Sequence, residues 1–175
     1  KIRKFLSYDR TKLIVQSVIM SRIDYCNSLL YGIPEVHLGK LQRMQNSAAR
    51  LISCTSRYDH ITPVLIDLHW LPVRYRITYK VAVMTFKAVH DLAPSYIKEL
   101  VKIKPLAQYH LRSNSSVILV DPSIGYKKTL GDRSFTAAAP KVWNSLPDFI
   151  RNQNNFLSFK SALKTHLFRQ AYNIS

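Results

Sequence analysis

The chain has 175 residues, of which 26 are Lys or Arg and 10 are Asp or Glu, so its formal net charge at pH 7 is +16. With 47% hydrophobic residues and only 4 glycines, the composition excludes wholesale disorder and predicts one domain or two small ones. The positive charge predicts a polyanionic partner, above all nucleic acid. A basic but inert surface is the alternative. A membrane surface is the weaker reading, because no segment approaches the roughly 18 apolar residues of a span.

The start of the chain and its cysteines bear on location. The chain begins Lys-Ile-Arg-Lys without Met, which predicts a fragment, and no apolar stretch with a cleavage site follows, so we expect no signal peptide. Cys26 and Cys54 lie on separate predicted helices and form no Cys-x-x-Cys pair. This favours two buried, reduced thiols over a zinc site or a disulfide. We therefore expect an intracellular protein, in the nucleus and cytoplasm.

The first third of the chain predicts two helices, over 11–31 and 38–53, because apolar residues recur there at every third or fourth position. Gly32 lies between them and is a common helix terminator. Thr62 and Pro63 predict the start of a short third helix, because threonine caps free N–H groups and proline fits the first helical position.

Residues 68–90 are predicted to form the centre of the fold. After Pro72 we expect a helix over 75–91 that is apolar nearly all round, with only a narrow cationic strip, and such helices are usually buried. Trp70 adds a large apolar surface just upstream. Trp70 and this helix are the predicted hub on which the other helices pack. The predicted core residues are Trp70, Ile77, Val81, Met84, Phe86, Trp143, Phe159 and Leu163.

The last third of the chain mixes a strand signal with further helices. The β-branched run at 117–120 predicts a strand, and we expect a small hairpin near 116–129 that leans on the helices. Helices are predicted over 135–145 and 156–171. The predicted fold class is therefore mainly α, a compact multi-helix domain with one small β-hairpin.

The sequence predicts no catalytic or metal centre. No two carboxylates are adjacent, as two-metal phosphoryl transfer would favour, and the six histidines show no metal-ligand spacing. Cys54 lies near Asp59 and His60, but only this closeness in sequence supports a nucleophile. His60 and His69 fit capping or core hydrogen bonds better than metal binding. We expect no catalytic residue, no metal, no cofactor and no small-molecule substrate in this segment.

Cationic side chains recur in rows at helical spacing. Cations along helices follow a phosphate backbone and release its counterions, so these rows are the candidate nucleic-acid-binding residues. For each single cation the alternative is a solvated side chain. The candidates are Arg43, Arg50 and Arg57; Arg74, Arg76, Lys80 and Lys87; and, around the predicted hairpin, Lys127, Lys128, Arg133 and Lys141.

Eight segments follow one another in the order of a known family. They are 21–32, 41–51, 60–65, 68–77, 92–96, 131–135, 139–147 and 158–160. Through them almost the whole chain resembles the C-terminal segment of the polyprotein of jockey-like non-LTR (LINE) retrotransposons, downstream of the reverse-transcriptase palm. The chain departs from the family pattern at Ser47 and Leu130, where that pattern has Ala and Tyr.

The resemblance implies part of an RNA-directed DNA polymerase that acts in target-primed reverse transcription. The Tyr-x-Asp-Asp motif of the polymerase is absent from these 175 residues. The segment would therefore hold template RNA or primer duplex beside the upstream palm, and Mg²⁺ would serve the parent polymerase. We expect a thumb-like helical region at 1–58, a central region at 59–110 and the hairpin with the C-terminal helices at 111–175, with a single domain as the alternative.

Two other functions stay open at this point. The chain is, in the second hypothesis, a decayed or domesticated fragment that serves as a structural or protein-interaction module. An independent enzyme is the third hypothesis, and it has the least support because no catalytic constellation is present in the sequence.

Overall fold

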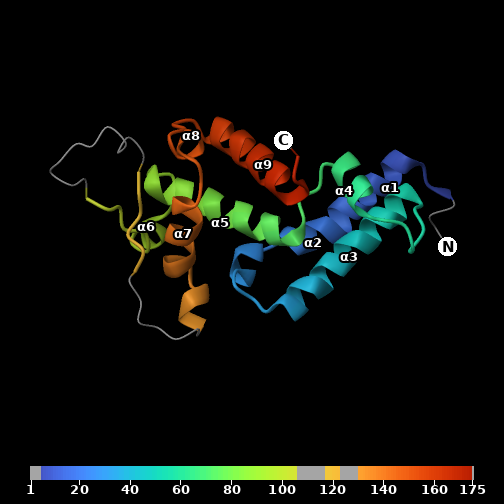
Figure 1. The fold of residues 1–175 in the computed structure, drawn as a ribbon, viewed down its shortest axis with the longest axis horizontal. Helices are drawn as coiled ribbons and strands as arrows, with labels where there is room; N and C mark the ends of the chain where they lie inside the picture. Colours follow the sequence, from blue (N-terminus) through green and yellow to red (C-terminus); the bar gives the residue numbers. More distant parts are fainter. Residues whose placement is uncertain (1–4, 106–116, 123–129, 175) are drawn as a thin grey trace.

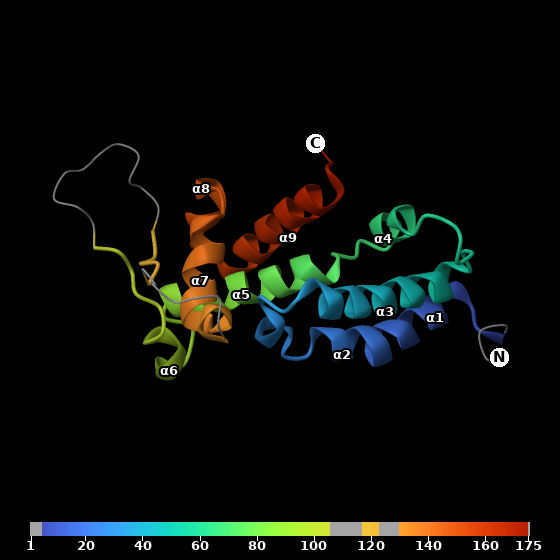
Figure 2. The same ribbon diagram turned by 60° about the horizontal axis from the view of Figure 1, so that its bottom comes forward.

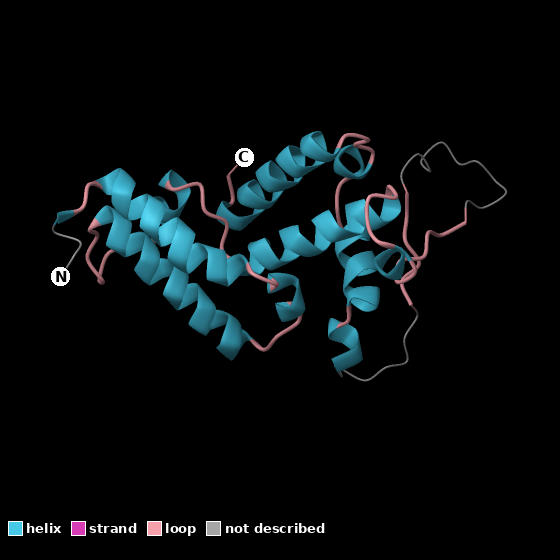
Figure 3. Ribbon diagram, turned by 180° about the vertical axis from the view of Figure 1, so that it is seen from behind, coloured by secondary structure: helices cyan, strands magenta, loops and turns pink. Residues whose placement is uncertain are grey.

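The computed structural model describes residues 5–105, 117–122 and 130–174. Figures 1 and 3 show that this part of the chain is built from helices, so the predicted mainly α class is confirmed. In chain order the elements are α1 (Tyr8–Val15), the π-helical η2 (Gln16–Met20), α2 (Ser21–Asp24), the 3₁₀ turn η3 (Asn27–Leu30), α3 (Glu35–Ser53), α4 (Thr62–Asp67), α5 (Val73–Val89), α6 (Ser95–Lys98), the 3₁₀ turn η4 (Leu130–Arg133), α7 (Phe135–Asn144), α8 (Asp148–Arg151) and α9 (Phe156–Tyr172).

The N-terminal arm, residues 8–24, is one helical rod formed by α1, η2 and α2, and it lies antiparallel to α3 (Figures 1 and 2). The Ser7 side chain caps its start by accepting a hydrogen bond from a backbone N–H of the first turn. The rod ends earlier than the helix predicted over 11–31. Tyr25 has an extended backbone conformation, and Cys26 has a left-handed one with a φ of 50°. A right-handed helix cannot continue through these two residues.

Helix α5 lies at the centre of the molecule, and its two halves belong to two different hydrophobic clusters (Figure 1). The first half contributes Val73 and Ile77 to a cluster with the N-terminal arm, α3 and α4. The second half contributes Val81 and Phe86 to a cluster with α7, α8 and α9. A helix that is apolar on most of its circumference can serve both clusters at once. This agrees with the prediction that Trp70 and the helix after it form the hub.

Two glutamines of α3 fix the segment through which the chain enters α5. Gln45 is fully buried and donates a hydrogen bond from Nε2 to the carbonyl oxygen of Leu71 at 2.8 Å. Gln42 accepts a hydrogen bond from the backbone N–H of Val73 at 2.9 Å and donates one to Oε1 of Gln45 at 3.0 Å. Because a buried amide costs free energy unless it is hydrogen-bonded, this pair selects one register between α3 and the start of α5.

The predicted β-hairpin near 116–129 is not supported by the described part of the chain. Residues 117–120 form there only an isolated antiparallel bridge, between Ile103 and Leu119, and not a paired strand. The expected return strand lies outside the described residues. The partner of the predicted strand is thus the segment after α6, far back in the sequence.

Side chains of α7 hold this bridge segment in place. The Asn144 amide accepts a hydrogen bond from the Leu119 N–H at 3.0 Å and donates one to the Leu119 carbonyl at 2.9 Å. The Trp143 indole N–H donates to the Val117 carbonyl at 2.8 Å. An amide that offers a donor and an acceptor replaces the partner strand here. The β-branched run therefore serves to bury Leu119, which is 1% exposed.

The predicted core residues lie in the two clusters with one exception. The buried ones are Trp70, Ile77, Val81, Phe86, Trp143, Phe159 and Leu163. Met84 is only partly buried, which corrects the prediction that it belongs to the core. It lies one turn after Lys80 and one turn before Lys87, on the strip of α5 that the clusters leave partly open.

The contrast between Phe86 and Met84 gives a test of this core. Phe86 is fully buried and stacks on Phe159 with ring centroids 4.2 Å apart, so Phe86→Ala is expected to lower the free energy of unfolding by about 3–5 kcal/mol. Met84→Ala removes far less buried surface, and its expected cost is about 1 kcal/mol. Urea denaturation measures both losses. Equal losses for the two variants would contradict the burial described here.

Candidate nucleic-acid interface

Helices α5 and α9 lie side by side and run antiparallel (Figures 1 and 2). The Phe156 ring at the start of α9 lies 5.9 Å from the Phe86 ring near the end of α5. The Tyr172 hydroxyl at the end of α9 donates a hydrogen bond to the Trp70 carbonyl just before α5. Neither helix contains an Asp or a Glu. Their cations are Arg74, Arg76, Lys80 and Lys87 on α5 and Lys160, Lys164 and Arg169 on α9.

At one end of the seam between these helices, two lysines share one aromatic ring. The ammonium nitrogen of Lys87 on α5 lies 5.1 Å from the centroid of the Phe156 ring, and that of Lys160 on α9 lies 5.3 Å from it. Each contact is a cation–π attraction, which holds the two charges close despite their mutual repulsion. A pair of positive charges from two helices is thereby fixed at this point of the surface.

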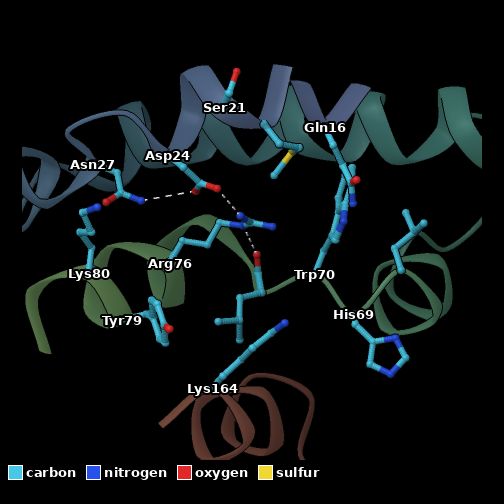
Figure 4. A pocket seen from close by; sticks show the side chains of 13 residues that line it. Gln16, Ser21, Asp24, Asn27, His69, Trp70, Arg76, Tyr79, Lys80 and Lys164 are labelled. Carbon is cyan, nitrogen blue, oxygen red and sulfur yellow. Dashed lines mark hydrogen bonds and ion pairs between the residues drawn. The ribbon is translucent and has the colours of Figure 1, made fainter. Parts of the chain in front are cut away.

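At the other end of the seam lies a cavity of about 570 Å³ (Figure 4). Lys80 of α5 and Lys164 of α9 line it, together with Arg76, Tyr79 and Trp70. Burial raises the pKa of Tyr79, so this hydroxyl stays neutral at physiological pH and can donate a hydrogen bond. The cavity therefore combines cations with neutral donors.

Arg76 is the least exposed of these cations, and two interactions position it. Its Nη1 lies 2.7 Å from a carboxylate oxygen of Asp24 on α2, and its Nε donates to the Leu71 carbonyl at 2.8 Å (Figure 4). The side chain is only 17% exposed. A guanidinium that is fixed in this way presents its remaining N–H groups in one direction, because its fork is planar and rigid.

Five cations thus form one row along the seam, which we call the α5–α9 track: Arg76, Lys80, Lys87, Lys160 and Lys164. Between Arg76 and Lys87 a rise of about 1.5 Å per residue gives roughly 16 Å. Along the axis of a duplex, one strand has a phosphate roughly every 3.4 Å, so this length corresponds to about five phosphates. The track has the length and the sign of charge that a short stretch of sugar–phosphate backbone requires.

The cations predicted on and after α3 lie apart from the track. Arg50 folds back on the loop after α3, where it donates to the carbonyls of Ser56 at 3.1 Å and Asp59 at 2.9 Å. Arg57 lies over the neighbouring tyrosine ring, with 4.8 Å to its centroid, and Arg43 is exposed on α3. The contacts of Arg50 and Arg57 thus stay within the loop after α3 and involve no residue of the track.

The remaining predicted cations divide into three cases. Arg74 is exposed and forms an ion pair with Glu35 of α3. Lys141 is exposed on α7, and the aliphatic part of Arg133 packs beside Gly32, where an added Cβ would lie 3.0 Å from it. Lys127 and Lys128 lie outside the described residues.

Sequence reasoning missed Lys160 and Lys164. Each is an isolated lysine on a helix whose apolar stripe predicts packing in the core. The signal that could have identified them is the absence of acidic residues: the helix Phe156–Tyr172 carries basic residues and no Asp or Glu. Basic residues without acids on a surface helix indicate a face that meets a polyanion.

Two absences hold for the part of the chain that the structure describes. Within it no group of three or more His, Cys, Asp or Glu side chains is arranged to hold a metal ion. No helix there has both the length and the apolar character that crossing a membrane requires. Cys26 and Cys54 are both free and exposed, so the prediction that these thiols are buried is wrong: each lies beside a helix end, where the backbone is left-handed.

Comparison with known proteins identifies no relative: no family model, no curated protein and no solved structure matches the chain. The resemblance to jockey-like retrotransposon polyproteins therefore stays a prediction from the sequence.

The Tyr172 hydroxyl, which fixes the Trp70 backbone beside the cavity, gives a prediction in alkaline solution. Burial raises the pKa of Tyr172 to about 12, against a smaller lowering by the charge of Arg76. The unfolded chain releases this proton near pH 10, at about the ordinary pKa of tyrosine. The folded state retains it longer, so the stabilisation is complete below about pH 10 and is lost as the pH rises to about 12. Tyr172→Phe should remove this part of the pH dependence, measured by urea denaturation across that range. Parallel curves for the two proteins would contradict the assignment.

Proposed function

We propose that this chain binds the sugar–phosphate backbone of nucleic acid through the α5–α9 track and carries out no chemistry of its own. The observation that supports this most directly is the pairing of cations across two helices without acids. Lys87 with Lys160 and Lys80 with Lys164 come from opposite sides of one seam. A merely solvated basic surface would have no reason to align its charges in this way.

The chemistry of the track favours recognition of backbone over recognition of sequence. Lysine is a compact point charge that suits phosphate oxygens, and phosphate contacts fix position without reading the bases. Each neutralised phosphate releases a counterion, which makes affinity fall as salt is added. A net charge of +16 adds long-range attraction toward any polyanion.

The parent protein that the resemblance implies gives this binding a role. We propose that the chain is a segment of a non-LTR retrotransposon reverse transcriptase, or a remnant of one. In that role it holds template RNA or primer duplex during target-primed reverse transcription, beside the upstream polymerase palm. Mg²⁺ and the bond-forming chemistry belong to the palm in this proposal, and the protein works in the nucleus and cytoplasm.

A protein-interaction module is the second candidate function, and exposed apolar side chains of the N-terminal region favour it. Leu13 is 67% exposed, Tyr25 80% and Leu29 77%. Apolar side chains gathered on a helical surface mark contact sites for other proteins. A module of this kind predicts no steep loss of nucleic-acid affinity with salt, and this separates it from the first proposal.

The salt dependence of affinity tests the track. Wild-type protein is expected to bind duplex RNA or DNA with an affinity that falls linearly in a plot of log K against log salt concentration. Lys160→Gln removes one phosphate contact and should reduce the steepness of that slope by about 0.9. Fluorescence anisotropy of a labelled duplex measures both slopes.

Arg43→Gln is the matched control, because it removes one exposed cation on α3 and leaves the track intact. Its slope should equal that of the wild type. Equal losses for Arg43→Gln and Lys160→Gln would show that charge anywhere on the surface suffices. That result would reject the track, and a wild-type affinity that does not change with salt would reject nucleic-acid binding altogether.

A further inference from the structure

The cavity at the end of the α5–α9 track differs from the rest of the track because it is hollow and closed on one side. We propose that it holds the phosphate monoester of a nucleotide, either the terminal phosphate of a bound strand or that of a free mononucleotide. The strand-end form of this inference rests on the proposed function, since the track would lead the strand to the cavity.

The balance of charge around the cavity favours a doubly charged phosphate. Among its lining residues Arg76, Lys80 and Lys164 are cationic, and Asp24 is the one carboxylate, already paired with Arg76. A phosphate monoester carries a charge of about −1.5 to −2 at pH 7, whereas a backbone phosphodiester carries one. With Arg76 paired to Asp24, Lys80 and Lys164 leave two positive charges in the lining, and these match a charge near −2 better than the single charge of an internal phosphate.

The walls of the cavity explain why an end fits better than a continuous backbone. Gln16, Met20 and Ser21 of the N-terminal arm line the side that faces α5 and α9 (Figure 4). The arm crosses above the end of the seam, as Figure 4 shows, with the arm on one side and Lys164 of α9 on the other. A strand that follows the lysines toward the cavity meets this wall and has to stop there.

Unsatisfied polar groups in the cavity wall indicate a ligand with donors and acceptors. Asn27 is 3% exposed, and its side-chain carbonyl oxygen is buried without a hydrogen-bond partner among the described residues. Trp70 also lines the cavity, and its indole N–H, which solvent can reach, donates to no described residue. Buried polar groups without partners are rare in folded proteins and mark sites where a partner is expected. The sugar hydroxyls and the base of a nucleotide offer both kinds of partner.

The size of the cavity agrees with this ligand. Small-molecule sites usually measure about 300–1,000 Å³, and this cavity of about 570 Å³ falls within that range. Bare phosphate would leave most of the space unfilled. A nucleotide places its phosphate among the cations and still has room for its sugar and base beside Trp70.

The first experiment compares strands that differ only at their ends. Oligonucleotides of one sequence carry a phosphate or a hydroxyl at the 5′ end, and a second pair differs in the same way at the 3′ end. We expect a preference of about tenfold for the phosphorylated strand of one pair, as charge-assisted hydrogen bonds to the additional charge would give.

Two variants assign this preference to the cavity. Lys164→Gln removes a cation that the cavity shares with the track, so it should weaken the hydroxyl strand about as much as Lys160→Gln does and, in addition, abolish the preference for the phosphorylated strand. Lys160→Gln is the matched control on the same helix, one turn away and outside the cavity lining. It should weaken both strands alike and keep the preference. Steep salt dependence with no preference at either end would overturn the strand-end form of this inference and leave the proposed function standing.

The second experiment uses free ligands and distinguishes the two sources of the phosphate. Adenosine monophosphate should shift the indole N–H signal of Trp70 in a nitrogen–proton correlation spectrum and leave that of Trp143, which is bonded to Val117, in place. Adenosine, which lacks the phosphate, should produce no such shift. If no strand binds the protein, the proposed function fails. The inference then stands only if adenosine monophosphate still shifts the Trp70 signal. Equal shifts with adenosine, or no shift together with no end preference, would overturn it.

Discussion

The fold depends on one helix that belongs to two hydrophobic clusters. The first turns of α5 bury Val73 and Ile77 among the arm, α3 and α4, and its later turns bury Val81 and Phe86 among α7, α8 and α9. Each group of helices packs part of its core against α5. The burial of α5 on both sides is therefore the constraint that fixes where every other helix lies, and it also explains why the molecule is long and not round (Figure 1).

The same constraint decides which side chains of α5 remain available for binding. The apolar residues occupy most of the circumference, so Arg76, Lys80 and Lys87 share the strip that also carries the partly buried Met84, whereas Arg74 pairs with Glu35 of α3. Gln42 and Gln45 fix the start of the helix against α3, and this sets the direction of that strip. Helix α9 then packs beside it and brings its own lysines to the seam. The orientation in which α5 is buried thus also determines the direction in which its row of cations faces.

The sequence predicts the helices well and their partners poorly. The helical period of 3.6 residues in the apolar pattern is a property of the local sequence, so the central helix and its core residues could be inferred from 68–90 alone. The strand predicted at 117–120 is a single bridge residue, because Asn144 bonds to Leu119 on one side and the segment 102–104 bonds to Ile118 and Val120 on the other. For the site, the row of cations on α5 was predicted from the sequence. Arg50 was also predicted to bind nucleic acid, but it donates its hydrogen bonds to the loop after α3. The lysines of α9 join the row only through tertiary packing, which no local pattern encodes.

The charges of the track carry a cost to the isolated protein, and this cost indicates what they are for. Five cations share one seam with a single nearby carboxylate, Asp24, so they repel one another and weaken the packing of α9 on α5. The Phe156 ring offsets part of this repulsion for the two lysines that flank it. An acidic residue on either helix would relieve the rest, yet both helices lack one. In the proposed function, phosphate groups would supply that missing negative charge from outside, and binding a polyanion would then relieve the repulsion among the lysines.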